Sequence, residues 1–206
     1  MNKIIHHHFK IYKPFGMLSQ LTSGEPRQLR KKRFLGELHT FPNGTMPIGR
    51  LDEKSEGLLL MTTDGKLADY INTTGIEKEY WVQLDGFITA KPISQMEKGV
   101  SIGLFGEKYT TKYCQVNLME THPILPPPDS RLRIGVHRPT SWIRVILTEG
   151  KFRQIRKMTA AVGYPTVRLI RVRIGQIGLG TMMTGDVNPV LDLPFQFFGS
   201  KSGEKS

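Results

Sequence analysis

The sequence has little of the material on which several classes of protein depend. It holds one cysteine, Cys114, in 206 residues, which excludes an internal disulfide framework and a cysteine-rich zinc site. No apolar run approaches the roughly 18 residues that a membrane-spanning helix needs. The N-terminus shows neither the apolar segment of a secretory signal nor an amphipathic transit segment. We therefore expect a soluble, cytoplasmic protein with no membrane partner.

Motifs of other enzyme classes are missing too. The sequence has neither a nucleophile elbow nor a phosphate-binding P-loop, which argues against hydrolase and NTPase activities. The run His6-His7-His8 could suggest a metal tract or part of a purification tag, but no cysteine or paired histidine motif accompanies it. We expect no metal site.

What is present is enough apolar material for a core and a large excess of positive charge. Apolar residues make up 38% of the chain, and 29 Lys and Arg against 18 Asp and Glu give a net charge of +11. The excess lies in two blocks, residues 1–50 (net +7) and 131–173 (net +10), which flank an acidic middle at 51–130 (net −5). If the fold brings the blocks together, they form one positive surface suited to a polyphosphate backbone. A nucleic acid is thus favoured over a membrane surface, because no segment pairs a basic face with a broad apolar one.

The pattern of apolar residues and turn signals predicts an α+β fold around a largely antiparallel sheet with flanking helices. Residues 20–47 read as loop-rich, and prolines make 122–130 an exposed loop that could separate two subdomains. Strands are expected at 9–12, 57–61, 79–84, 142–147 and 166–174, and helices at 66–71, 92–99 and 151–162.

Two segments carry side chains that could do chemistry. Asp52 follows a turn at Gly49, at the mouth of an apolar strand; it is either a turn or cap residue or a catalytic carboxylate. In the predicted helix 151–162, the side chains of Arg153, Arg156 and Lys157 share one face, with Phe152, Ile155 and Val162 on the opposite, core-facing side. Cations at a helix start oppose the helix dipole. The basic face is therefore either solvated or directed at phosphates or a buried carboxylate.

Three ordered motifs resemble the pseudouridine synthases, and more narrowly the branch that modifies ribosomal RNA. They are KPFG at 13–16, GRLDEKSEG at 49–57 followed by LLLMTTDG, and EGKFRQIRKM at 149–158, which runs into AAVG at 160–163. The likeness extends from about Phe9 to Leu191. Within that branch the sequence is most similar to the large-subunit (23S) E type, on YKPFGMLSQ at 12–20 and GELH at 36–39.

The resemblance implies a catalytic domain at 1–197 with a central catalytic cleft, no N-terminal S4 domain and a flexible tail at 198–206. It implies that Asp52 is the catalytic carboxylate, that Arg156 pairs with it, and that Tyr80 stacks on a uridine flipped out of large-subunit ribosomal RNA. No cofactor is implied. Leu169 is expected to line the pocket, although a place in the core is nearly as plausible for it.

The resemblance and the charge pattern together give a set of expected RNA contacts. Arg50 would touch the RNA backbone or fill the gap left by the flipped base, and Lys13 would also support the wall of the active site. The full set is Lys13, Arg30, Lys31, Lys32, Arg33, Arg50, Lys151, Arg153 and Lys157. The basic run at 27–33 can alternatively be a solvated loop.

Two other functions stay open at this point. The first is a non-catalytic ribosome-assembly protein that uses the same basic surface, and the second is a glycosidase-like hydrolase with Glu53 or Glu56 as the second carboxylate. The favoured hypothesis remains the pseudouridine synthase, and we expect it to be a monomer that acts on ribosomal RNA or on a ribosome-assembly intermediate.

Overall fold

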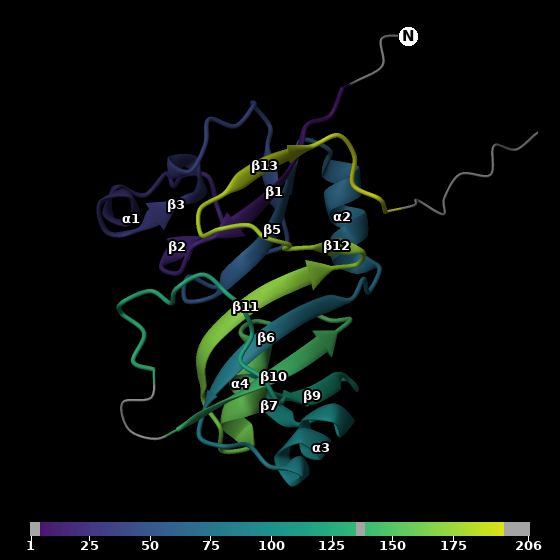
Figure 1. Cartoon of the computed structure of the whole chain (residues 1–206). Helices are drawn as coiled ribbons and strands as arrows, with labels where there is room; N and C mark the ends of the chain where they lie inside the picture. Colours follow the sequence, from purple (N-terminus) through teal and green to yellow (C-terminus); the bar gives the residue numbers. More distant parts are fainter. Residues whose placement is uncertain (1–4, 135–138, 196–206) are drawn as a thin grey trace, which may run out of the picture.

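One large sheet runs through the computed structural model, which describes residues 5–134 and 139–195 (Figure 1). The strand order is β13-β1-β5-β11-β6-β10-β9, with β4 paired to β5 and β12 to β11. The strands are β1 (His8–Lys13), β2 (Met17–Leu18), β3 (Arg33–Phe34), β4 (Met46–Ile48), β5 (Glu56–Thr62), β6 (Lys78–Asp85), β7 (Ser101–Leu104), β8 (Glu107–Thr110), β9 (Gln115–Met119), β10 (Thr140–Leu147), β11 (Thr166–Ile174), β12 (Ile177–Gly178) and β13 (Val187–Val190).

The helices are short and lie around this sheet. They are α1 (Pro26–Lys31), α2 (Gly65–Thr73), α3 (Ala90–Lys98), α4 (Gln154–Ala161) and a 3-10 turn at Leu35–Glu37. Within the part of the chain that the structure describes, none is long and apolar enough to cross a membrane. Alternation along the strands buries a cluster on each face of the sheet: Leu169 belongs to one and its neighbour Ile170 to the other. The α+β prediction with a mostly antiparallel sheet is confirmed.

The centre of the sheet is a narrow parallel seam between β5 and β11. These two strands pair only at Ile170 with Glu56 and at Arg171 with Gly57. The guanidinium of Arg168 donates two hydrogen bonds across the seam to the Glu56 carboxylate, at 3.0 and 2.9 Å, and both side chains are almost fully buried. Arg171 crosses the same seam to the carbonyl of Leu58 at 2.8 Å. The chain just before β5, which contains Asp52, is therefore held firmly against the second half of the sheet.

The predicted strands and the two predicted helices at 66–71 and 92–99 are confirmed, with ends that differ by at most two residues. Three expectations need correction or extension. The loop-rich stretch 20–47 contains α1, β3 and β4, and the chain also forms β7, β8, β9, β12 and β13, which were not predicted. The helix expected at 151–162 begins at Gln154. The predicted tail at 198–206 lies outside the described residues.

Candidate active site

Asp52 lies in the turn between β4 and β5. The turn is closed by a hydrogen bond from the Ser55 N–H to the Asp52 carbonyl at 3.0 Å. Leu51 is anchored from both sides, because its N–H donates to the Ser19 hydroxyl at 3.0 Å and its carbonyl accepts from that hydroxyl at 2.7 Å. Within the described residues the Asp52 carboxylate accepts no backbone hydrogen bond, and its one ion pair is with Arg153. The turn and cap alternatives for Asp52 therefore do not describe what its side chain does.

Lys13 holds the same turn from below, which corrects its expected place among the RNA contacts. The side chain is completely buried. Its Nζ donates to the carbonyls of Met17 at 2.6 Å, Pro14 at 2.8 Å and Glu53 at 3.4 Å. Burial lowers the pKa of Lys13 to about 7. Because the ammonium faces protein carbonyls, Lys13 supports the wall beside Asp52 and is out of reach of a phosphate.

A cavity of about 90 Å³ opens above Asp52. Tyr80 on β6 and Leu169 on β11 form part of its wall, and both side chains are buried on the same face of the sheet. Arg50, Lys151 and Arg153 complete the group of predicted residues that line it. The structure thus brings six of the residues singled out from the sequence to one small cavity. Leu169 lines it while also belonging to the core cluster, so both interpretations of that residue hold.

Arg153, rather than Arg156, makes the direct ion pair with Asp52. Its Nη1 lies 3.8 Å from Oδ2 of Asp52, and 39% of the Arg153 side chain is exposed. The expected pairing of Arg156 is corrected by its contacts: its Nη2 donates to the carbonyl of Lys54 at 2.6 Å, and its Nη1 to that of Thr166 at 3.3 Å. Burial and the charge of Arg153 lower the pKa of Arg156, whereas the charge of Asp52 acts to raise it. Arg156 therefore binds the turn two residues after Asp52 and acts on the carboxylate only through the field of its charge.

The position of Arg153 follows from how α4 begins. Arg153 is the N-cap residue and adopts a left-handed backbone conformation, with φ of 52°. Preceding it, the N–H of Lys151 donates to Oε1 of Gln154 at 3.0 Å, and Nε2 of Gln154 donates to Glu149 at 2.5 Å. This arrangement turns the Arg153 side chain out of the helical face that it was predicted to share with Arg156 and Lys157. It also leaves Phe152 exposed, not in the core as expected.

Sequence reasoning missed a hydrogen-bonded group formed by Glu149, Gln154 and Tyr109, of which Gln154 lines the cavity. The Glu149 carboxylate accepts from the Tyr109 hydroxyl at 2.6 Å and from the backbone N–H of Lys112 at 3.0 Å. These contacts span about forty residues of sequence, so no local pattern predicts them. The only available signal was that Glu149 and Gln154 belong to the third motif.

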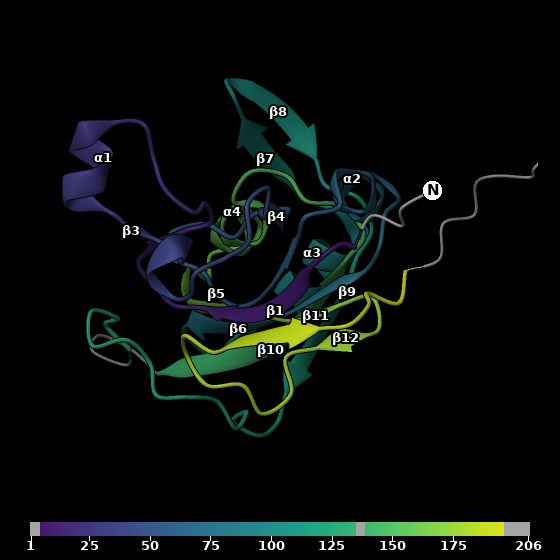
Figure 2. The same ribbon diagram turned by 90° about the horizontal axis from the view of Figure 1, so that it is seen from above.

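The remaining expected RNA contacts lie outside the cavity. Four of them are exposed, at the end of α1 and just beyond it: Arg30, Lys31, Lys32 and Arg33. Lys32 pairs with Glu53 at 2.8 Å, which ties this basic arm to the turn that carries Asp52. Lys157 donates to the carbonyl of Gly103 at 2.6 Å. Figure 2 shows α1 and the β7–β8 hairpin projecting from the same face of the sheet, with α4 between them.

No set of three His, Cys, Asp or Glu side chains with the geometry of a metal site occurs among residues 5–134 and 139–195. The cavity instead offers one carboxylate, several cations, a phenol and an apolar wall. Such a group can bind an anionic ligand that carries a flat ring, and it can present a carboxylate to it.

Comparison with known proteins gives one consistent family. A family described as RNA pseudouridylate synthase matches residues 7–161. The chain is 39% identical over 165 residues to a ribosomal large subunit pseudouridine synthase E of Xanthomonas axonopodis pv. citri, covering 79% of this chain and 83% of that one. It is 32% identical over 175 residues to the protein of that name from Vibrio parahaemolyticus, covering 84% and 69%. A crystal structure of a pseudouridylate synthase superposes with a TM-score of 0.69 at 24% identity, covering 90% of this chain and 70% of that one.

Proposed function

The chain belongs to the RNA pseudouridylate synthase family, and from this premise we propose that it isomerises a uridine of large-subunit ribosomal RNA to pseudouridine. The observation that carries the proposal is the Asp52 cavity, in which a carboxylate stands against a buried tyrosine, an apolar wall and a cation. The names of the relatives supply the RNA class.

The reaction conserves all atoms of the nucleotide. The bond between C1′ of the ribose and N1 of the base breaks, the base turns, and a new bond forms from C1′ to C5. The proton on C5 is lost and N1 is protonated, so neither oxidant nor reductant is required. The Asp52 carboxylate acts as the nucleophile or stabilises the severed sugar, and Arg153 orients its oxygens. Tyr80 provides the ring on which the flipped base stacks.

The small size of the cavity sets a condition on the substrate. A base reaches Asp52 only after it leaves its helix, which costs a few kcal/mol and less where the base is already unpaired. The target is therefore a uridine in a locally open part of the RNA. The net charge of +11 disfavours self-association, which supports action as a monomer. Ribosomal RNA as substrate supports an activity in the cytoplasm, on free RNA or on an assembly intermediate.

The test compares wild type with Asp52→Asn on unmodified large-subunit ribosomal RNA, with pseudouridine mapped by chemical labelling. We expect a modified position with wild type and none with the variant, because the amide cannot act as a nucleophile. RNA binding should be retained, since Asp52 is one small group in a large basic surface. Pseudouridine made by the variant at the wild-type rate contradicts the mechanism. Binding by both proteins without isomerisation by either supports the ribosome-assembly alternative.

A further inference from the structure

Two exposed phenylalanine rings form a pair beside the cavity. Phe105 at the tip of the β7–β8 hairpin is 89% exposed, and Phe152 is 56% exposed. Their rings are stacked, with centroids 6.0 Å apart and planes 26° from parallel. Phe152 stands between Lys151 and Arg153, which both line the cavity. A flat apolar surface thus adjoins the segment that lines the Asp52 cavity.

The stability of the hairpin does not explain why a phenylalanine occupies position 105. Phe105 and Gly106 connect the two strands, and both have positive φ, 51° and 92°. Two-residue hairpin turns of this kind favour Asn or Gly at the first position, and a bulky side chain there is strained. Arg153 is the other residue apart from glycines with positive φ within the described ranges. Such strain is typical of binding and catalytic positions, where the surrounding structure enforces it.

The hairpin is fixed to the segment that lines the cavity. Lys157 donates to the Gly103 carbonyl at 2.6 Å, and its Nζ lies 5.1 Å from the centre of the Phe152 ring. Tyr109 on β8 donates to Glu149 at 2.6 Å. These contacts fix the position of the ring pair relative to the segment that lines the Asp52 cavity. Figure 2 shows the hairpin standing away from the sheet.

The charges around the rings identify the ligand. The hairpin carries Glu107 and Lys108, whereas the residues that follow or neighbour Phe152 are basic: Lys151, Arg153 and Lys157. Aromatic rings set among cations are the usual arrangement for unpaired nucleotides, since the bases stack on the rings while the cations meet the phosphates. We propose that Phe105 and Phe152 form a stacking platform for an unpaired RNA base next to the target uridine. The proposal rests on the function proposed above and adds to it a determinant of binding outside the cavity.

The test uses variants that remove each ring without disturbing the fold. Phe105→Asn suits the turn conformation, and Phe152→Leu keeps an apolar side chain. Phe105→Trp and Phe152→Tyr retain a ring, and Phe87→Leu is the matched control, because Phe87 is 67% exposed but is not part of the ring pair. The probe is a fluorescein-labelled single-stranded RNA of mixed sequence, compared with a ribose-abasic strand of the same length.

We expect the ring-removing variants to bind the RNA about 5- to 100-fold more weakly, with the ring-retaining variants and the control near wild type. The abasic strand should bind all of them equally. The slope of log affinity against log salt should stay unchanged, because stacking involves no phosphate contact. Equal binding of the RNA by all variants overturns the proposal, and so does a reduced salt slope, which would indicate displaced lysines.

The same variants separate this proposal from the function on which it rests. If wild type makes no pseudouridine in large-subunit RNA but the ring-removing variants still lose affinity for the single strand, the function fails and the platform stands. If wild type isomerises the RNA and the variants bind and modify it equally well, the platform fails alone. If the ring-removing variants lose activity on ribosomal particles but not on free RNA, the rings contact a protein partner, and the platform proposal is overturned.

Discussion

Arg153 and Arg156 are three residues apart, yet they meet Asp52 in different ways. Arg153 reaches the carboxylate from a left-handed N-cap position. Arg156 is half-buried and donates to the backbone carbonyls of Lys54 and Thr166. Their shared motif suggests equal roles on one helical face, but the start of α4 at Gln154 separates them. Arg153 therefore pairs with the Asp52 carboxylate, and Arg156 supports the turn that carries it.

We expect Arg153→Gln and Arg156→Gln to differ in kind. Arg153→Gln should lower the single-turnover rate on saturating RNA with little change in melting temperature, because its side chain is partly exposed. Arg156→Gln should lower stability by about 1–3 kcal/mol, since two backbone carbonyls lose a charged donor, and should lower the rate as the turn loosens. Thermal unfolding and rapid-quench assays on the same preparations measure both. A stable Arg156→Gln enzyme together with an unfolded Arg153→Gln would reverse the assignment.

Among the elements, β5 and β11 set the geometry of the cleft. Their short parallel seam brings the turn before β5 next to the chain that leads into β11 from α4. Gly57 permits this approach: its φ is +98°, and a Cβ at this position would collide with the carbonyl of Arg171. The second motif thus contains a glycine for a packing reason as well as a carboxylate for chemistry.

Gly57→Ala should destabilise the protein by more than about 2 kcal/mol, because it adds backbone strain to a clash with main-chain atoms. Gly103→Ala is the matched control, as it lies in a strand, has no positive φ and has open space where the methyl group would stand. We expect Gly103→Ala to change stability by less than about 0.5 kcal/mol. Urea unfolding followed by circular dichroism measures both. Equal stability of the two variants would show that the seam between β5 and β11 can widen without a loss of folding free energy.

The elements also show which parts of the fold can be predicted from the sequence. β10 and β11 are apolar, β-branched runs bounded by turn signals, so local pattern suffices for them. β9 and the β7–β8 hairpin are short and mostly exposed: β7 and β9 each bury one side chain, Ile102 and Val116, and β8 buries none, so the local apolar pattern is too short to predict them. β13 forms through its pairing with β1, far away in sequence. Asp52, Tyr80 and Leu169 were found through motifs, whereas the contact of Glu149 with Tyr109 depends on tertiary structure alone.

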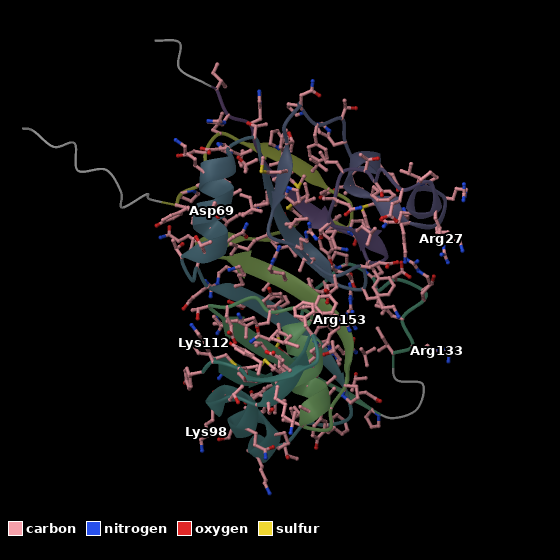
Figure 3. All side chains as sticks on the ribbon, turned by 180° about the vertical axis from the view of Figure 1, so that it is seen from behind. Arg27, Asp69, Lys98, Lys112, Arg133 and Arg153 are labelled. Atoms are coloured by element: carbon pink, nitrogen blue, oxygen red, sulfur yellow. The ribbon has the colours of Figure 1, made fainter. Side chains whose placement is uncertain are left out.

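At the scale of the whole molecule, two carboxylates of the acidic middle are buried in ion pairs with arginines of the second basic block. Glu56 is buried against Arg168, and Glu79 pairs with Arg144 at 2.7 Å and with Arg173 at 3.0 Å. Exposed cations of both basic blocks remain, among them Arg27 and Arg30 on α1 and Arg133 before β10. Figure 3 shows Arg27 and Arg133 on one side of the molecule, with Arg153 nearer its centre. Arg27 of the first basic block and Arg133 of the second therefore lie on the same side of the molecule.

This arrangement predicts which cations make the affinity for RNA depend on salt concentration. Replacing Arg27, Arg30 and Lys31 with Gln removes three exposed cations of α1 that have no ion pair within the described residues. The slope of log affinity against log salt should become shallower by about 2, since each lost phosphate contact contributes about 0.7 to 0.9.

The control changes the net charge equally but elsewhere, by replacing Lys66, Lys91 and Lys98, which are exposed on α2 and α3. Its slope should remain that of wild type, and titrations of the single-stranded RNA over a range of KCl concentrations compare the two triple variants. If both lower the slope alike, the RNA responds to the overall charge of the protein, and α1 makes no contact of its own. If only the α1 variant does so, the basic arm grips the strand whose uridine enters the Asp52 cavity.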